Sequence, residues 1–174
     1  MPGALVARRF QRSCKAPTAF FGTESDRLSR ACLAMARRFQ RGGRLLVFGE
    51  GAQATDAHHV AVEFVHPVLV GKRALPAIAL TTDARIVETI ARPDDIAMAI
   101  SCDAGSDELH RALDVAQSRG LLTLHLAGGE MPPENVDYAF VVPTDDAMVV
   151  QEVHETLYHV LWELVHVFFD HRIA

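Results

Sequence analysis

A histidine and a glutamate four residues apart, His59 and Glu63, have the spacing in this chain that most directly indicates chemistry. On a helix, side chains at positions i and i+4 project from the same face, so the two could share a metal ion or a substrate proton. Such a pair is also common as an ordinary surface interaction. The spacing by itself leaves both interpretations open, and His58 beside the pair points elsewhere.

Further polar side chains interrupt an apolar stretch near the end of the sequence. Gln151, His154 and His159 fall in a helix predicted from about residue 146 to 170. A buried helix seldom carries such groups without partners. At about 100° per residue, Gln151 and His159 project within roughly 80° of each other, although their backbones lie about 12 Å apart along the axis. We therefore expect these side chains to lean inward, or a neighbouring subunit to contribute.

The segment Gly49-Glu50-Gly51-Ala52-Gln53 precedes the helix that carries His59. Between a strand and a helix, backbone N–H groups and the helix dipole can bind an anion. The segment is neither a P-loop nor a G-x-G-x-x-G motif, so a plain strand-to-helix turn is an equally good interpretation. The other histidines show no comparable grouping and are interpreted as surface or packing residues: His110, His125, His166 and His171.

The elements that must position these residues follow an α/β pattern. Short apolar runs predict strands at residues 44–49, 77–80, 96–101, 121–127 and 138–142. Helical patterns lie between the first four of them, near residues 54–66, 84–91 and 106–119. Such alternation predicts a parallel sheet covered on both faces. Before the first strand, Thr23-Glu-Ser-Asp predicts the capped start of an amphipathic helix that ends at Gly42 and Gly43.

Composition excludes several classes of protein. The chain has 174 residues, 49% of them hydrophobic and 22% charged, which predicts a single globular domain. Its three cysteines form no C-x-x-C pair, so we expect neither a disulfide framework nor a zinc knuckle, and a reducing, cytoplasmic compartment. The apolar stretch from Met148 to Phe169 contains glutamates and histidines that a membrane span would not tolerate, and no signal peptide is evident.

The net charge of −5 argues against nucleic acid as a partner. It conceals an asymmetry, because residues 1–44 hold ten basic and two acidic side chains, and the rest of the chain carries −13. A solvated helix face is the simpler explanation. The alternative is that this basic region docks on an acidic surface of a neighbouring subunit.

Several motifs, taken together, resemble the sugar isomerase (SIS) domain family, and within it the phosphoheptose isomerases. The resemblance covers residues 20–170 and rests on the first loop and three further stretches: Asp56-Ala-His-His-Val-Ala-Val-Glu63, Leu75-Pro-Ala-Ile-Ala-Leu-Thr-Thr-Asp83, and Gln151-Glu-Val-His154 with His159. It implies one SIS domain over residues 1–174, with a flavodoxin-like five-stranded parallel sheet flanked by helices. It also implies N-terminal helices within residues 1–43 that are used in oligomer packing, in a homotetramer or a homodimer.

The resemblance further implies active sites between subunits and a divalent metal, with zinc expected. The family's metal ligands fall on His59, Glu63, Gln151 and His159, and all four side-chain types match. In the family's mechanism a glutamate removes a proton from an open-chain ketose and a histidine acts as the acid, roles that fall here to Glu63 and His159. A metal-bound group is a poor proton shuttle, so the two roles compete unless the metal is partly displaced.

The departures from the family concern the substrate. In the family the first loop reads Gly-Asn-Gly-Gly-Ser, whereas this chain has Gly49-Glu50-Gly51-Ala52-Gln53. The family's phosphate loop reads Ser-Thr-Ser-Gly-Asn-Ser, whereas this chain has Ser101-Cys102-Asp103-Ala104-Gly105-Ser106. An Asn-Asp-Tyr-Gly stretch and the short helix after it are missing before Arg92-Pro93-Asp94. Asp103 places a carboxylate where a phosphate should lie, at a cost of about 4 kcal/mol for like charges about 4 Å apart. The substrate-binding positions that the resemblance implies are Glu50, Gly51, Gln53, Ser101, Cys102, Asp103, Ser106 and Gln151.

Two functional hypotheses follow. The first is a metal-dependent sugar-phosphate isomerase acting on sedoheptulose 7-phosphate or a related ketose phosphate, supported by the residues of the metal site. The second is a repurposed SIS protein, a metal-binding accessory or a protein-interaction module that has lost phosphate binding, supported by the altered loops. A phosphosugar-sensing regulator ranks last, because no DNA-binding segment is evident.

Overall fold

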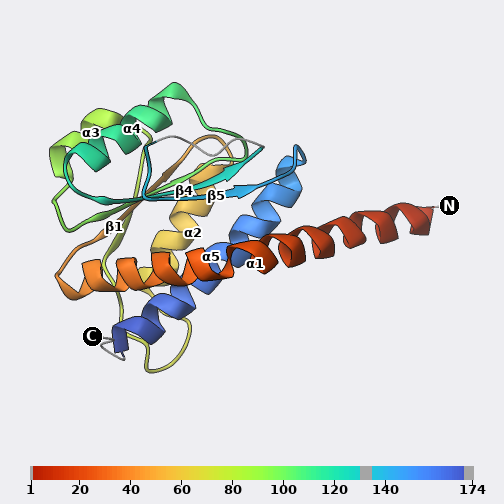
Figure 1. Cartoon of the computed structure of the whole chain (residues 1–174), viewed down its shortest axis with the longest axis horizontal. Helices are drawn as coiled ribbons and strands as arrows, with labels where there is room; N and C mark the ends of the chain where they lie inside the picture. The colour runs from red at the N-terminus through yellow and green to blue at the C-terminus, as the bar shows by residue number, and fades with distance from the viewer. Residues whose placement is uncertain (1, 130–134, 171–174) are drawn as a thin grey trace.

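A computed structural model describes residues 2–129 and 135–170 as one α/β domain (Figure 1). The strands are β1 (Leu45–Gly49), β2 (Ala77–Leu80), β3 (Ile96–Ile100), β4 (Leu122–Gly128) and β5 (Tyr138–Val142). The helices are α1 (Pro2–Gln40), α2 (Gln53–Val65), α3 (Ala84–Ile90), α4 (Asp107–Ser118) and α5 (Ala147–Asp170). The strands predicted from the sequence are therefore confirmed, with small differences at their ends.

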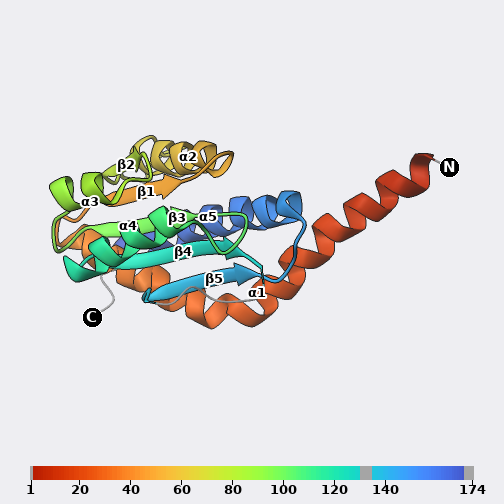
Figure 2. The same cartoon turned by 90° about the horizontal axis from the view of Figure 1, so that it is seen from above.

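All strand pairs are parallel, in the order β2-β1-β3-β4-β5. Helices α1, α2 and α5 cover one face of the sheet, and α3 and α4 cover the other (Figures 1 and 2). Strands β1, β3 and β4 are buried along their whole length, which explains the continuous apolar sequence of β1 and β3. The order reverses between β1 and β3, so the chain leaves these two strands toward opposite faces and a crevice forms at their carboxyl ends.

The prediction of several N-terminal helices, one of them starting at Thr23, is wrong. A single helix, α1, runs from Pro2 to Gln40, with Pro17 inside it. The hydroxyl of Thr23 donates to the carbonyl of Phe20 at 3.0 Å, so Thr23 satisfies its own helix and caps no new one. Burial of Phe20 and Leu28 against the core gives the helix one continuous apolar stripe across the predicted break. The N-terminal part of α1 extends beyond the body of the domain (Figure 2).

Several basic side chains of residues 1–44 contact acidic groups of the same chain, which neither interpretation of the charge asymmetry anticipated. Arg9 pairs with Glu152 at 2.8 Å, and Arg44 pairs with Asp95 at 2.6 Å. Asp95 is 1% exposed and accepts hydrogen bonds from both the backbone and the side chain of Arg44. This buried pair ties the amino end of β1 to the turn before β3, and so fixes the register of the two strands that bound the crevice.

Candidate functional site

Three of the four predicted metal ligands meet on one face of the molecule. Helix α2 supplies His59 and Glu63, and α5 supplies His159. Oε1 of Glu63 lies 3.4 Å from Nε2 of His59 and 3.1 Å from Nε2 of His159. All three ligand atoms lie within 4.8 Å of one another, close enough to bind one ion. Two imidazoles and a carboxylate are a donor set that suits zinc and leaves a coordination position open for a substrate.

Packing between α2 and α5 holds this cluster in place. The hydroxyl of Tyr158 lies 3.1 Å from Nδ1 of His59, on the opposite side of the ring from Nε2. The indole N–H of Trp162 donates to the backbone carbonyl of Glu63 at 2.9 Å. Burial, together with nearby carboxylates such as Asp56, raises the pKa of Tyr158, so it stays a neutral phenol. A histidine that binds a metal usually has a hydrogen-bond partner on its other ring nitrogen, which holds the ring in orientation.

Gln151, the fourth predicted ligand, lies beside Asp56 at the start of α2. Its amide nitrogen donates to the two carboxylate oxygens of Asp56 at 3.1 and 3.3 Å. Burial raises the pKa of Asp56, and the charge of Glu155 adds to this, while the hydrogen bond from Gln151 and the proximity of His59 oppose it. These hydrogen bonds hold the amide nitrogen of Gln151 toward Asp56, so the amide oxygen of Gln151 faces away from Asp56.

The loop after β3 contains the predicted phosphate contacts, and it uses most of its polar groups internally. The Ser101 hydroxyl donates to the carbonyl of Asp103 at 2.7 Å, and Ser101 is 5% exposed. The carboxylate of Asp103 accepts from the backbone N–H of Gly105 at 2.9 Å. The half-buried Cys102 packs against β4, where a Cβ on Gly128 would lie 2.1 Å from the Cys102 carbonyl. Only glycine at position 128 lets the loop lie this close to the sheet.

The first loop reaches across the crevice to the second one. A Glu50 carboxylate oxygen accepts a hydrogen bond from the hydroxyl of Ser106 at 2.6 Å. Ser106 is also the N-cap of α4, because its hydroxyl accepts from the backbone N–H of Leu109 at 3.1 Å. Gly51 is exposed with a φ of 56°, whereas Gln53 is 8% exposed and buried in the first turn of α2. Of the predicted substrate-binding residues in the first loop, Gly51 is therefore on the surface and Gln53 is buried.

Two histidines beneath this loop have a larger part than the sequence suggested. Of the two interpretations of His125, surface or packing residue, burial favours packing: His125 is fully buried on β4, and in addition its Nε2 lies 2.8 Å from the Ser101 hydroxyl. His154 on α5 is equally buried, with Nε2 3.2 Å from the carbonyl of Ala127. A histidine inside an otherwise apolar strand pattern was the available signal, because a buried polar group needs a partner.

Both buried histidines are neutral in the folded protein. Burial, with a smaller contribution from the nearby His110 and His154, lowers the pKa of His125 to about 3, while Asp103 opposes the shift. Burial lowers the pKa of His154 to about 4. His166 packs as predicted, between the carbonyls of Trp162 and Arg73, and His171 lies outside the described residues.

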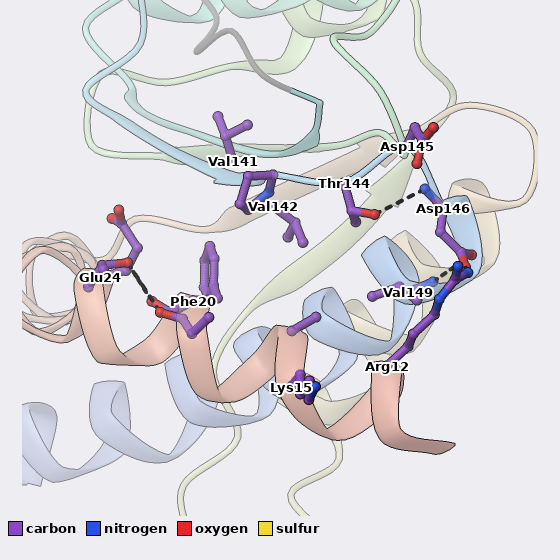
Figure 3. Close-up of a pocket in the computed structure, with 14 residues that line it drawn as sticks. Arg12, Lys15, Phe20, Glu24, Val141, Val142, Thr144, Asp145, Asp146 and Val149 are labelled. Carbon is purple, nitrogen blue, oxygen red and sulfur yellow. Dashed lines mark hydrogen bonds and ion pairs between the residues drawn. The ribbon is translucent and has the colours of Figure 1, made fainter. Parts of the chain in front are cut away.

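Of two hollows in the described surface, one lies away from the predicted site residues and the other is lined by some of them. A cavity of about 690 Å³ lies between α1, the end of β5 and the start of α5 (Figure 3), and its described lining includes none of the predicted site residues. In Figure 3, Phe20 of α1 lies at the left, Val142 of β5 lies above, and Arg12, paired with Asp146, lies at the right. A second hollow of about 450 Å³ is lined by Glu50, Gly51, His58 and residues 79–82. The second one therefore adjoins the crevice.

Comparison with known proteins decides the family. The model of the SIS domain matches residues 10–108, more than half of the chain. The chain belongs to the SIS domain family. Among curated relatives, it is 34% identical to a phosphoheptose isomerase of Thermodesulfovibrio yellowstonii, covering 92% of this chain and 89% of the relative. It is 32% identical to that of Aquifex aeolicus, covering 92% and 94%.

Solved structures agree with the SIS fold. The structure of a phosphoheptose isomerase from Francisella tularensis has a TM-score of 0.86 at 23% identity, covering 96% of this chain and 99% of that one. The enzyme from Neisseria gonorrhoeae has a TM-score of 0.83 at 23% identity, covering 95% and 98%. The predicted flavodoxin-like SIS architecture is therefore confirmed. Among the described residues, no helix is both long and apolar enough to span a membrane.

Proposed function

We propose that this SIS protein is a divalent-metal-dependent aldose–ketose isomerase of the phosphoheptose isomerase type. The observation that carries the proposal is the meeting of His59, Glu63 and His159 within 4.8 Å. The names of the relatives, found over nine tenths of the chain, support a sugar phosphate such as sedoheptulose 7-phosphate as the substrate class.

Glu63 is the residue that we assign as the base. It removes a proton from the carbon next to the substrate carbonyl. His159, in the state in which it carries a proton and does not bind the metal, gives that proton to the carbonyl oxygen, and an enediol results. The hydroxyl on the other carbon of the enediol then gives its proton back to His159, and Glu63 returns its own proton to the former carbonyl carbon, so both residues regain their starting states. Both histidine contacts are to Oε1 of Glu63, so we assign the proton transfer to Oε2.

The donor set fits a divalent ion, with zinc as the expected metal. Such an ion, when bound, supplies a positive charge that polarises an oxygen of the substrate. Gln151 stays a predicted fourth ligand, supported by the hydrogen bond to Asp56 that leaves its amide oxygen free to face elsewhere. Tyr158 would hold the ring of His59 in the orientation that the ion requires.

The length of α2 bears on the shape of the substrate. Gln53, the buried first residue of α2, and His59 are six residues apart, or about 9 Å along the helix axis at 1.5 Å per residue. A substrate that placed its phosphate in the crevice and its carbonyl at Glu63 would have to be an extended open chain.

The test of this function is direct. Protein loaded with zinc is incubated with sedoheptulose 7-phosphate, and the product is followed by NMR, with metal content determined on the same sample. We expect the protein to convert sedoheptulose 7-phosphate to an aldose phosphate. This activity should be lost when a chelator removes the metal and restored when zinc is added back. Stoichiometric zinc without turnover of this or any other ketose phosphate would reject the isomerase.

A second candidate is a metal-binding accessory protein that binds no phosphosugar. The contact between Glu50 and Ser106 favours it, because a carboxylate already lies where the family's substrate phosphate would be held. This candidate predicts zinc bound at His59, Glu63 and His159, together with no thermal shift from any ketose phosphate. Binding of a sugar phosphate at millimolar or lower concentration would reject it.

Residues 1–43 are proposed to mediate assembly into a homotetramer or a homodimer. Leu5, Val6 and Phe10 on the extended part of α1 are 62%, 70% and 68% exposed, an unusual apolar stripe for a free helix. Light scattering on the full chain measures the mass. Leu5→Glu with Phe10→Glu should reduce it to that of a monomer, whereas Arg8→Glu on the same helix should not.

A further inference from the structure

The contact between the two loops crosses the position at which ligands bind in sheets of this topology. Strand order 2-1-3-4-5 reverses between β1 and β3, and ligands bind in the crevice outside the carboxyl ends of the strands at this reversal. Glu50 follows β1 directly, and Ser106 ends the loop that follows β3. Their 2.6 Å hydrogen bond therefore spans the crevice itself.

The groups around Ser106 are arranged for an anion. Helix α4 begins there, and its first backbone N–H groups favour a negative charge. The anion present is the carboxylate of Glu50. The Ser106 hydroxyl has one proton, which it donates to Glu50, so a phosphate oxygen can accept that proton only when Glu50 leaves.

The rest of the loop offers little in compensation. The proton of Ser101 goes to the carbonyl of Asp103, so the Ser101 oxygen accepts from Nε2 of His125. His125 is fully buried, its Nδ1 has no partner among the described residues, and its Cε1 would lie 3.3 Å from a Cβ on Gly105. An unpartnered nitrogen thus lies beneath the loop, while the Asp103 carboxylate adds a second negative charge above it.

We infer that Glu50 is a specificity-determining residue that competes with the phosphate of the substrate for Ser106 and the start of α4. The inference rests on the proposed function, because it concerns the substrate class of the same site. Glu50 also lines the neighbouring hollow of about 450 Å³, beside Thr81 and Thr82, which has room for its side chain when it leaves Ser106. A sugar phosphate must displace Glu50, whereas a ligand with a neutral hydroxyl at this end leaves it in place.

The test measures phosphate binding separately from turnover. Inorganic phosphate is titrated calorimetrically into the full-length, zinc-loaded wild type and into Glu50→Gln, which keeps the shape of the side chain and removes its charge. We expect the affinity of the variant to rise about tenfold or more. Glu88→Gln, which makes the same charge change on α3, should bind phosphate as the wild type does.

A double-mutant cycle separates local competition from a general change in charge. Ser106→Ala should weaken phosphate binding, and should remove most of the gain when it is combined with Glu50→Gln. Thermal unfolding and zinc content of each variant verify that the fold is intact. An unchanged affinity in Glu50→Gln, a gain that persists without Ser106, or no phosphate binding by either protein would overturn the inference.

Turnover of sedoheptulose 7-phosphate by the same samples distinguishes this inference from the proposed function. Tighter phosphate binding without turnover leaves Glu50 as the competitor and rejects the isomerase. Turnover with no effect of Glu50→Gln on phosphate affinity or on KM keeps the isomerase and rejects Glu50 as the competitor.

Discussion

The α2–α5 cluster and the crevice between β1 and β3 use their polar side chains in opposite ways. In the cluster, the ligand atoms of His59, Glu63 and His159 converge, and Tyr158 holds one ring from behind. In the crevice, the polar groups are satisfied by one another, with Glu50 bonded to Ser106 and Ser101 to the backbone of its own loop. The cluster can therefore bind a ligand without rearranging, whereas a ligand in the crevice must first break the hydrogen bond between Glu50 and Ser106.

The difference shows that catalytic chemistry and substrate recognition depend on separate elements of this fold. The cluster lies on two helices packed on the same face of the sheet, and their register fixes it. The crevice is formed by loops, which accept substitution without cost to the core. A SIS protein can therefore keep its acid–base residues while its preference for phosphate changes.

The largest effect is expected from Glu63→Gln. The amide cannot take a proton from carbon and is a weaker metal ligand, so turnover of sedoheptulose 7-phosphate should fall by about 10²–10⁴-fold. NMR measures the conversion, and competition with a chelator measures zinc affinity. Glu88→Gln on α3, which makes the same change of charge away from the cluster, is the control. Wild-type turnover in Glu63→Gln would mean that the cluster is not the catalytic site.

The pH dependence of stability tests the two buried histidines under the crevice. His125 and His154 have folded-state pKa values of about 3 and about 4, below the ordinary value of 6.5. Below pH 6.5 the unfolded chain takes up protons that the folded protein excludes, so stability is lost as the pH falls toward 4. At pH 5 the loss is on the order of 2 kcal/mol for each histidine.

Urea unfolding between pH 7.5 and 5 measures this loss. His154→Gln keeps a donor for the carbonyl of Ala127 and should remove roughly half of the histidine contribution to the pH slope. His58→Gln, at an exposed histidine on α2, is the matched control for the substitution itself. Equal slopes in His154→Gln and the wild type would contradict the assignment of neutral, buried imidazoles.

Tyr158→Phe tests whether the cluster depends on the contact between the Tyr158 hydroxyl and His59. Loss of the hydroxyl that contacts Nδ1 of His59 should weaken zinc binding about tenfold with little change in stability. Tyr138→Phe on β5 is the matched control, because Tyr138 packs against Phe140 away from the cluster. Zinc affinities that do not differ between the two variants would remove Tyr158 from the site.

The smallest effect is expected from Ser106→Ala in the crevice. The change removes the N-cap of α4 and should lower the free energy of unfolding by about 1 kcal/mol. Zinc affinity should stay at the wild-type value, since the cluster lies on α2 and α5. Urea unfolding and chelator competition measure the two quantities, and a loss of zinc binding would show that the two regions are coupled.

Much of the fold and part of the site could be predicted from sequence. Continuous apolar runs such as Leu45 to Phe48 predicted the buried strands, because strands covered on both faces carry few polar residues. The break at Thr23 was wrong, because the local capping pattern competes with one apolar stripe that packs along the whole of α1. The role of His125 was missed because its partner, Ser101, is 24 residues away.

The sequence by itself determined which residues could do chemistry on each helix. The i, i+4 spacing put His59 and Glu63 on one face of α2, since helix geometry is local. Only the tertiary structure decided that His159, almost a hundred residues later, joins them, and that Gln151 is held by Asp56. Only the tertiary structure could bring Glu50 onto Ser106, because contacts between loops depend on strand order, which no local pattern encodes.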